Sequence, residues 1–164
     1  PLMHPNEIAA AVSVLKESGK ILDFGVSNFS PSQLSLLDNK TAVSVNQIEF
    51  SLTQHLAMHN GVLDQLLQKE ILPMSWSPLG SFFKEATKTN TRIKKVLDTF
   101  TKKYNATEDQ LLLAWILKHP SGVIPVVGTT SKVRLQNAVK ALDIELDLED
   151  WFTLLVECQG HKVP

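Results

Sequence analysis

Charge of one sign, cysteine pairs and long apolar runs are all scarce in this chain of 164 residues, and each scarcity excludes a class of protein. The net charge is −1 at pH 7, which gives no indication of nucleic acid or an anionic membrane surface as a partner. Cys158 is the only cysteine, so no internal disulfide can form, and we expect a reducing compartment such as the cytoplasm. No apolar run approaches the ~18 residues needed to cross a bilayer, and no signal-peptide pattern is present. We therefore expect neither a nucleic-acid nor a membrane partner.

The composition is that of an ordinary globular domain. Hydrophobic residues make up 43% of the chain and charged residues 20%. This length suffices for one domain with a substantial core. The first residue is Pro1 rather than Met, so we expect a chain that is processed or excised from something longer.

Four strand-sized apolar runs each stop abruptly at small or hydrogen-bonding residues. The predicted strands are 21–26, 43–48, 71–76 and 123–127. In a parallel α/β sheet, ligands bind at the carboxyl ends of the strands. The pattern therefore predicts a polar site at one end of a strand–helix array.

Helical patterns separate these strands. The predicted helices are 6–18, 61–70, 93–104, 107–118 and 131–142, with one more after Ser30 and one after Asp147, and 81–91 is expected to be a long loop. Capping boxes, Ser30 with Gln33 and Thr107 with Gln110, mark two of the helix starts. The expected inward-facing residues include Leu34, Leu37, Leu63, Leu66, Leu67, Leu111, Ala114, Trp115, Leu135, Ala138, Val139, Leu142, Trp151, Leu154 and Leu155.

This alternation predicts an α/β fold with parallel strands and right-handed crossovers. Four such strands can form a small open sheet or half of a (β/α)8 barrel, because a whole barrel takes ~250 residues.

The motifs at the strand ends resemble those of the aldo-keto reductase family. The segments that carry the resemblance are Gly25-Val26-Ser27-Asn28-Phe29, Val45-Asn46-Gln47-Ile48-Glu49, Met74-Ser75-Trp76-Ser77-Pro78-Leu79-Gly80 and Ile124-Pro125-Val126-Val127-Gly128-Thr129-Thr130. They are similar to strands five to eight of that family's barrel, in the same order, and Pro1-Leu2-Met3 resembles the segment just after strand four. The resemblance covers the whole chain, so residues 1–164 are interpreted as one partial domain: the C-terminal half of a TIM barrel with an extra C-terminal helix.

The resemblance implies an NADP(H)-dependent oxidoreductase that reduces aldehydes or ketones. It also implies that the family's catalytic tetrad of Asp, Tyr, Lys and His lies upstream of Pro1, so we expect no catalytic residue and no metal ligand in this chain. The chain then supplies the cofactor-binding half, pairs with a missing N-terminal half-barrel or with itself, and has little activity alone.

Three polar residues and one aromatic residue at strand ends match the family's nicotinamide site. By resemblance, Ser27, Asn28 and Gln47 hold the carboxamide, and Trp76 stacks on the ring. Without the resemblance, Ser27 and Asn28 are ordinary turn residues, Gln47 satisfies backbone groups, and Trp76 is a core aromatic.

The remaining candidates match the phosphate and adenosine sites. Ser77, Pro78, Leu79 and Gly80 pass beside the pyrophosphate, and Lys84 and Lys88 follow in a loop that in relatives often folds over the cofactor. Gly128, Thr129, Thr130 and Ser131 precede a helix N-terminus, which attracts phosphate. Arg134 can pair with a 2′-phosphate or stack on adenine, and Asn137 can reach the adenine amine. Arg134 favours NADP, whereas Ser131 stands where many relatives carry a longer basic group, which leaves NAD possible.

Two other functions are compatible with the residues alone. One is a non-enzymatic nucleotide-binding or regulatory half-barrel. The other is an interaction module that pairs with itself or with a missing half, because a half-barrel leaves two strand edges exposed.

Overall fold

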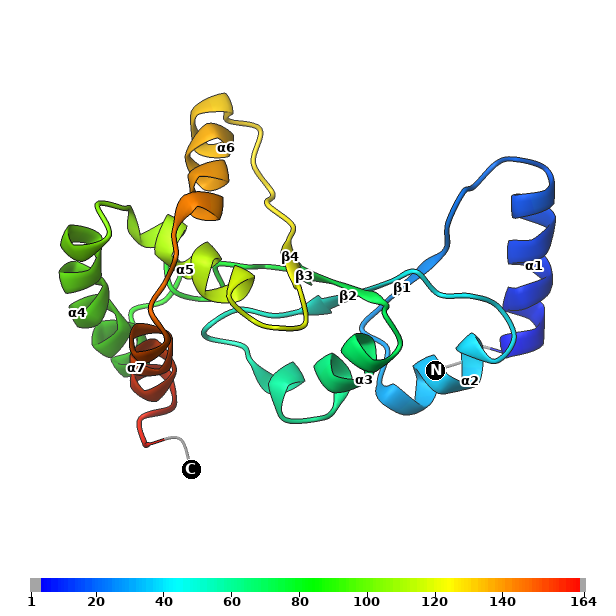
Figure 1. Ribbon diagram of the computed structural model, residues 1–164, viewed down its shortest axis with the longest axis horizontal. Helices are drawn as coiled ribbons and strands as arrows, with labels where there is room; N and C mark the ends of the chain where they lie inside the picture. The colour runs from blue at the N-terminus through cyan, green and yellow to red at the C-terminus, as the bar shows by residue number, and fades with distance from the viewer. Residues whose placement is uncertain (1–3, 163–164) are drawn as a thin grey trace.

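The computed structural model describes residues 4–162 and has one helix followed by four strands that alternate with helices (Figure 1). The strands are β1 (Gly25–Ser27), β2 (Val45–Glu49), β3 (Leu72–Trp76) and β4 (Ile124–Pro125). The helices are α1 (Pro5–Glu17), α2 (Pro31–Asp38), α3 (Val62–Gln68), α4 (Lys88–Lys103), α5 (Glu108–Leu117), α6 (Lys132–Val139) and α7 (Leu148–Gln159), and two 3₁₀ turns are η1 (Leu56–Met58) and η2 (Lys140–Asp143). All neighbouring strands are parallel, in the order β1-β2-β3-β4, as the alternating pattern predicted.

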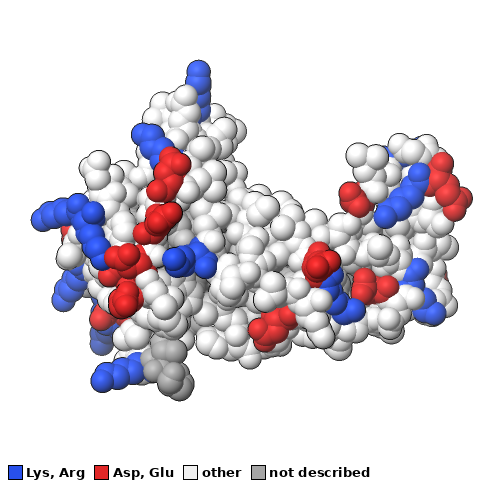
Figure 2. All heavy atoms as spheres, in the orientation of Figure 1, with Lys and Arg blue, Asp and Glu red and all other residues white. Residues whose placement is uncertain are grey.

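The two faces of the sheet differ in burial. Asn46, Ile48 and Ser75 are buried on one face, toward the helix layer. Gln47 and Trp76 point to the opposite face, because alternate residues of a strand face opposite sides, and both are only half-buried. Figure 1 shows α2 and α3 below the sheet, α1 rising at the right end of the molecule, and α6 rising above α5 on the left. Figure 2 shows the surface hollowed between α1 and α6, so this second face of the sheet is the more open one.

Both edge strands are shorter than predicted. β1 covers three residues and β4 two, where the apolar runs predicted 21–26 and 123–127. An edge strand has a ladder partner on one side only, and Pro125 has no backbone N–H to donate. The apolar run therefore overestimated how far hydrogen-bonded pairing extends.

Helix α4 begins earlier than predicted, inside the expected loop 81–91. Thr87 is its N-cap and accepts a hydrogen bond of 3.0 Å from the backbone N–H of Asn90. The buried amide of Asn90 donates to the carbonyls of Ser81 and Glu85. These bonds fix the end of the loop and start the helix before its apolar periodicity begins.

The expected inward face of α6 is exposed, so that prediction was wrong. Leu135, Val139 and Leu142 are 47%, 55% and 69% exposed. The helix contacts α5 and η2 and rises away from the short strand β4, so it has no sheet surface to cover. Leu67, also expected inward, is 54% exposed on the outer side of α3.

Helix α5 is the most deeply buried helix among the described residues. Every residue from Gln110 to Ile116 is buried. Trp115 stacks on Trp151 of α7 with ring centroids 4.8 Å apart and an interplanar angle of 4°. Each indole Nε1 donates to the other tryptophan's backbone carbonyl, at 3.1 and 2.8 Å. This reciprocal pair fastens α7 to α5.

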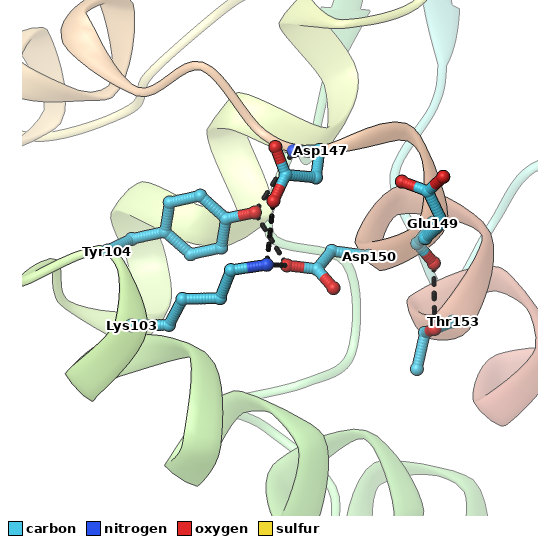
Figure 3. A network of polar contacts seen from close by, with 6 residues as sticks. All are labelled: Lys103, Tyr104, Asp147, Glu149, Asp150 and Thr153. Atoms are coloured by element: carbon cyan, nitrogen blue, oxygen red, sulfur yellow. Dashed lines mark hydrogen bonds and ion pairs between the residues drawn. The ribbon is translucent and has the colours of Figure 1, made fainter.

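A polar cluster joins the end of α4 to the start of α7 (Figure 3). The hydroxyl of Tyr104 donates to Asp150 at 2.5 Å and accepts from the backbone N–H of Asp147 at 3.0 Å. The ammonium of Lys103 contacts both aspartates at 2.7 Å. Asp147 is the N-cap residue of α7, as predicted, but its side chain pairs with Lys103 rather than capping the helix. Burial and the Asp150 carboxylate raise the pKa of Tyr104, so its hydroxyl stays protonated and able to donate.

Replacing Tyr104 by Phe is expected to lower the free energy of unfolding by about 1–2 kcal/mol, because the Asp150 carboxylate and the Asp147 N–H each lose a partner. Urea unfolding followed by circular dichroism measures the change. Thr153→Ala is the control, since the Thr153 hydroxyl bonds only within its own helix, to the Glu149 carbonyl, and should change stability by less than about 0.5 kcal/mol. Equal losses in the two variants would contradict a role for the cluster in joining α4 to α7.

Candidate functional site

Trp76 ends β3 and is held by a residue from the end of β1. Its indole Nε1 donates a hydrogen bond of 3.0 Å to Oδ1 of Asn28. Asn28 adopts a left-handed backbone conformation with φ of 56°, which asparagine tolerates better than most residues. The strand-end pattern thus brings two predicted site residues into direct contact, although they are 48 residues apart in sequence.

Ser27 and Gln47 lie beside this pair on neighbouring strands. They are register partners in the β1–β2 ladder. The backbone carbonyl of Gln47 accepts from the Ser27 hydroxyl at 2.9 Å and from the Asn28 N–H at 2.9 Å. The end of β1 is therefore anchored to β2, with the Gln47 side chain on the open face.

The segment 77–80 turns sharply away from the sheet. Ser77 has φ of 50°, an uncommon conformation for a residue with a side chain. Gly80 has φ of 55°, and a Cβ atom there would lie 2.0 Å from Oγ1 of Thr53 and 2.5 Å from Oγ of Ser51. Only glycine fits this close approach, so the small residue at the end of the third motif has a geometric explanation.

A cavity of about 810 Å³ lies beside this turn. Its lining residues come from the ends of β3 and β4, the following loops and two helices: Trp76, Ser77, Pro78, Leu79, Gly80, Phe83, Lys84, Asp109, Leu113, Val126, Val127, Gly128, Thr129, Arg134 and Ala138. This volume lies within the roughly 300–1,000 Å³ typical of small-molecule sites. Eight of the predicted site residues, from two separate motifs, therefore surround one space.

The start of α6 forms part of the cavity wall. Ser131 caps the helix by accepting from the Arg134 N–H at 3.4 Å, and Oγ1 of Thr129 accepts from the Ser131 N–H at 3.2 Å. Arg134 is exposed on the first turn of the helix and lines the cavity, whereas Thr130 is exposed outside it. With Lys84 on the facing loop, the cavity carries two cations beside one carboxylate, Asp109. This balance suits an anionic ligand.

Ser27, Asn28, Gln47, Thr130, Ser131 and Asn137 are not among the cavity-lining residues. The first three extend the site past Trp76 along the strand ends. Asn137 is bound to α5, where its Oδ1 accepts from Gln110 Nε2 at 2.8 Å and its Nδ2 donates to Asp109 Oδ2 at 3.3 Å. No sequence pattern singles out Asp109, Leu113 or Ala138 as site residues, because their positions in the cavity depend on how α5 and α6 pack.

Two half-buried ionisable side chains outside the cavity, Cys158 and His55, both contact the Leu52 carbonyl. Burial raises the pKa of the Cys158 thiol to about 11, so it is a poor nucleophile at neutral pH. Burial also lowers the pKa of His55, whose Nδ1 lies 2.8 Å from the Leu52 carbonyl.

Within the part of the chain that the structure describes, no group of three or more His, Cys, Asp or Glu residues is placed to hold a metal ion. Among residues 4–162, no helix has both the length and the apolar character needed to cross a membrane.

The family model for the aldo/keto reductase family matches residues 1–155 of the chain. This chain belongs to the aldo/keto reductase family. The oxidoreductase YcsN of Bacillus subtilis (strain 168) is 37% identical over the whole chain, and the oxidoreductase YdhF of Escherichia coli (strain K12) is 34% identical. A 6-dehydroglucose reductase of Agrobacterium fabrum is 35% identical over 99% of the chain.

The chain spans about half the length of these relatives, 55–56% of each. Its fold is similar to that of the thermostable aldo-keto reductase Tm1743, with a TM-score of 0.85 over 96% of this chain and 56% of that one, at 23% identity. The predicted half of a TIM barrel is thereby confirmed as the fold of this aldo/keto reductase chain. The predicted likeness of Pro1-Leu2-Met3 to the segment after strand four falls outside the described residues.

Proposed function

We propose that this chain is the cofactor-binding half of an NADP(H)-dependent reductase of aldehydes or ketones. One observation carries the proposal: the ends of parallel strands and the first turn of α6 surround a single cavity that reaches from Trp76 to Arg134. The bound cofactor supplies a hydride, and the residues of this chain bind and orient it.

The nicotinamide end would lie against Trp76. An indole stacked on one face of the ring leaves the opposite face for hydride transfer. Oδ1 of Asn28 is occupied by the Trp76 indole, so its Nδ2 remains to donate to the carboxamide oxygen. The Ser27 hydroxyl and the Gln47 amide lie on the adjoining strand ends, where they can hold the rest of the carboxamide.

The phosphate end would lie between the loop at 77–84 and the start of α6. Lys84 and Arg134 supply charge, and Gly128 and Thr129 approach without bulky side chains. Arg134 favours a 2′-phosphate and hence NADP, since guanidinium binds phosphate in a bidentate manner. A yeast relative, 30% identical over 83% of this chain, is an NADPH-dependent alpha-keto amide reductase, which supports the same preference.

We further propose that the catalytic tetrad of the complete enzyme lies outside this chain. The chain alone should then bind NADPH but reduce aldehydes at a rate close to the uncatalysed one. Robust reduction of carbonyls by the purified 164-residue chain would overturn this part of the proposal.

Arg134→Ala is expected to weaken NADPH binding by about 10-fold or more, because a charge-assisted hydrogen bond to a phosphate is lost. NADH binding should change by less than about threefold. Quenching of tryptophan fluorescence on titration gives both dissociation constants. Lys95→Ala, an exposed charge removal on α4, is the matched control. Absence of NADPH binding by the unaltered chain would refute the proposed function.

A second candidate is a self-associating half-barrel. The observation that favours it is the exposed apolar set Val133, Leu135, Val139 and Leu142 on and after α6. Figure 2 shows the hollow between α6 and α1 bordered mainly by uncharged residues. Sedimentation at a mass twice the 18.2 kDa of the chain, without NADPH binding, would favour this candidate.

A further inference from the structure

Asp109 occupies a place in the cavity that no strand-end motif indicated. It lies in the first turn of α5, and Leu113, four residues later, is on the same helical face. Arg134 and Ala138 have the same spacing on α6 and line the same cavity. Two helical faces, each with one charged and one apolar residue, therefore form this end of the cavity. Apolar side chains flanked by a guanidinium suit a flat aromatic base.

Asn137, the residue that sequence pattern assigned to the adenine amine, is already engaged within the protein. Its Oδ1 accepts from Nε2 of the buried Gln110 at 2.8 Å. Its Nδ2 donates to Thr107 Oγ1 at 3.2 Å and to Asp109 Oδ2 at 3.3 Å. Asn137 thus lies behind Asp109 and orients its carboxylate.

The Asp109 carboxylate keeps the capacity to accept further hydrogen bonds. Oδ1 accepts from the Thr107 hydroxyl at 2.5 Å, and Oδ2 accepts from Asn137. An ionised carboxylate has about four lone-pair sites and no donor. It therefore selects ligand groups that donate and repels those that only accept.

We propose that Asp109 accepts a hydrogen bond from the 6-amino group of adenine and that Asn137 is its positioning residue. This assignment rests on the proposed function, because the cofactor's nucleoside must lie between α5 and α6. It makes the base specificity of the site depend on α5, a helix that contains none of the strand-end motifs.

The test compares NADPH with its analogue in which hypoxanthine replaces adenine, so that a carbonyl oxygen takes the place of the amino group. Both are titrated into the 164-residue chain by tryptophan fluorescence. The analogue should bind about 10- to 100-fold more weakly, since a hydrogen bond to a charged group is lost and an acceptor faces an acceptor. In Asp109→Asn the ratio of the two dissociation constants, analogue over NADPH, should fall to within about threefold, because the asparagine amide can donate to the carbonyl of hypoxanthine.

Two further variants separate this role from a structural one. Asn137→Ala should reduce the ratio while leaving the Thr107–Asp109 contact in place. Asp143→Asn, an equal charge change at an exposed residue of η2, should leave the ratio as in the unaltered chain. Equal binding of both cofactors by the unaltered chain, or weakening of both by Asp109→Asn without a change in ratio, would overturn the inference alone. Failure of NADPH itself to bind would overturn the proposed function and the inference with it.

Discussion

Trp115→Ala is expected to lower the free energy of unfolding by about 3–5 kcal/mol, the largest effect of any single substitution considered for this chain. Trp115 is fully buried in α5 and touches both Phe50 and Trp151 through its ring. The substitution removes a large buried surface, leaves a cavity and deprives the Trp151 carbonyl of its donor. Such a loss is a large fraction of the stability of a typical domain.

Urea unfolding, followed by far-ultraviolet circular dichroism, measures this effect. Leu148→Ala is the matched control, because Leu148 also lies in the α5–α7 region but is 59% exposed. This control should lower the free energy of unfolding by less than about 1 kcal/mol. Trp115→Phe keeps most of the ring volume but removes the indole N–H, so its effect should fall between the two. Equal stability of Trp115→Ala and Leu148→Ala would mean that the stacked pair does not hold α7 in place.

Gly80→Ala is expected to destabilise the chain by about 2–4 kcal/mol, because overpacking adds to the strain of a left-handed alanine. The new methyl would lie 2.0 Å from Oγ1 of Thr53, which also accepts from the Ser81 N–H at 3.0 Å. Either the turn or the Thr53 and Ser51 side chains must therefore move, and where the turn moves, the cavity that it lines should lose affinity for NADPH by about 10-fold or more, since misplaced binding groups are costly.

The control for Gly80→Ala is Gly128→Ala, a glycine in the same cavity wall where a Cβ meets nothing within 4 Å. Its stability should change by less than about 1 kcal/mol. The double variant Gly80→Ala with Thr53→Ala should recover part of the lost stability, because the nearest clash is relieved. If the Thr53 change gives no recovery, the clash is not the cause of the loss.

Elements with strong local signals were predictable from the sequence. The capping boxes at Ser30 and Thr107 start α2 and α5 in the structure as expected. Leu34 and Leu37 are buried, as the helical period indicated. Local chemistry determines these features, so a single sequence contains the information.

Features that depend on packing at the edges were not predictable. The apolar period of α6 indicated a buried face, yet Leu135 and Val139 are exposed because the helix rises from a two-residue edge strand. The early start of α4 depends on the buried Asn90 amide, whose carbonyl partners follow no periodic pattern. A hydrophobic period shows which side of a helix is apolar, but not whether another element covers it.

The same distinction applies to the site. Trp76 and Gly80 stand out because they follow an apolar strand, and strand ends of a parallel sheet meet at one edge. Asp109 does not stand out in this way, because it lines the cavity from the first turn of α5, where an acidic residue is common at any helix N-terminus. The hydrogen bonds that Asn137 makes to Gln110 and Asp109 join α6 to α5 and appear only once the two helices are packed.

The reciprocal tryptophan pair also has a consequence for the order in which the helices pack during synthesis. Each of its two hydrogen bonds joins residues 36 positions apart, so α5 leaves the ribosome before α7 does. Until α7 has emerged, the indole of Trp115 lacks the Trp151 carbonyl and the Trp151 ring that stacks on it. We therefore expect the packing of α4 and α5 to be completed only after α7, which contacts α4 and pairs with Trp115, has emerged.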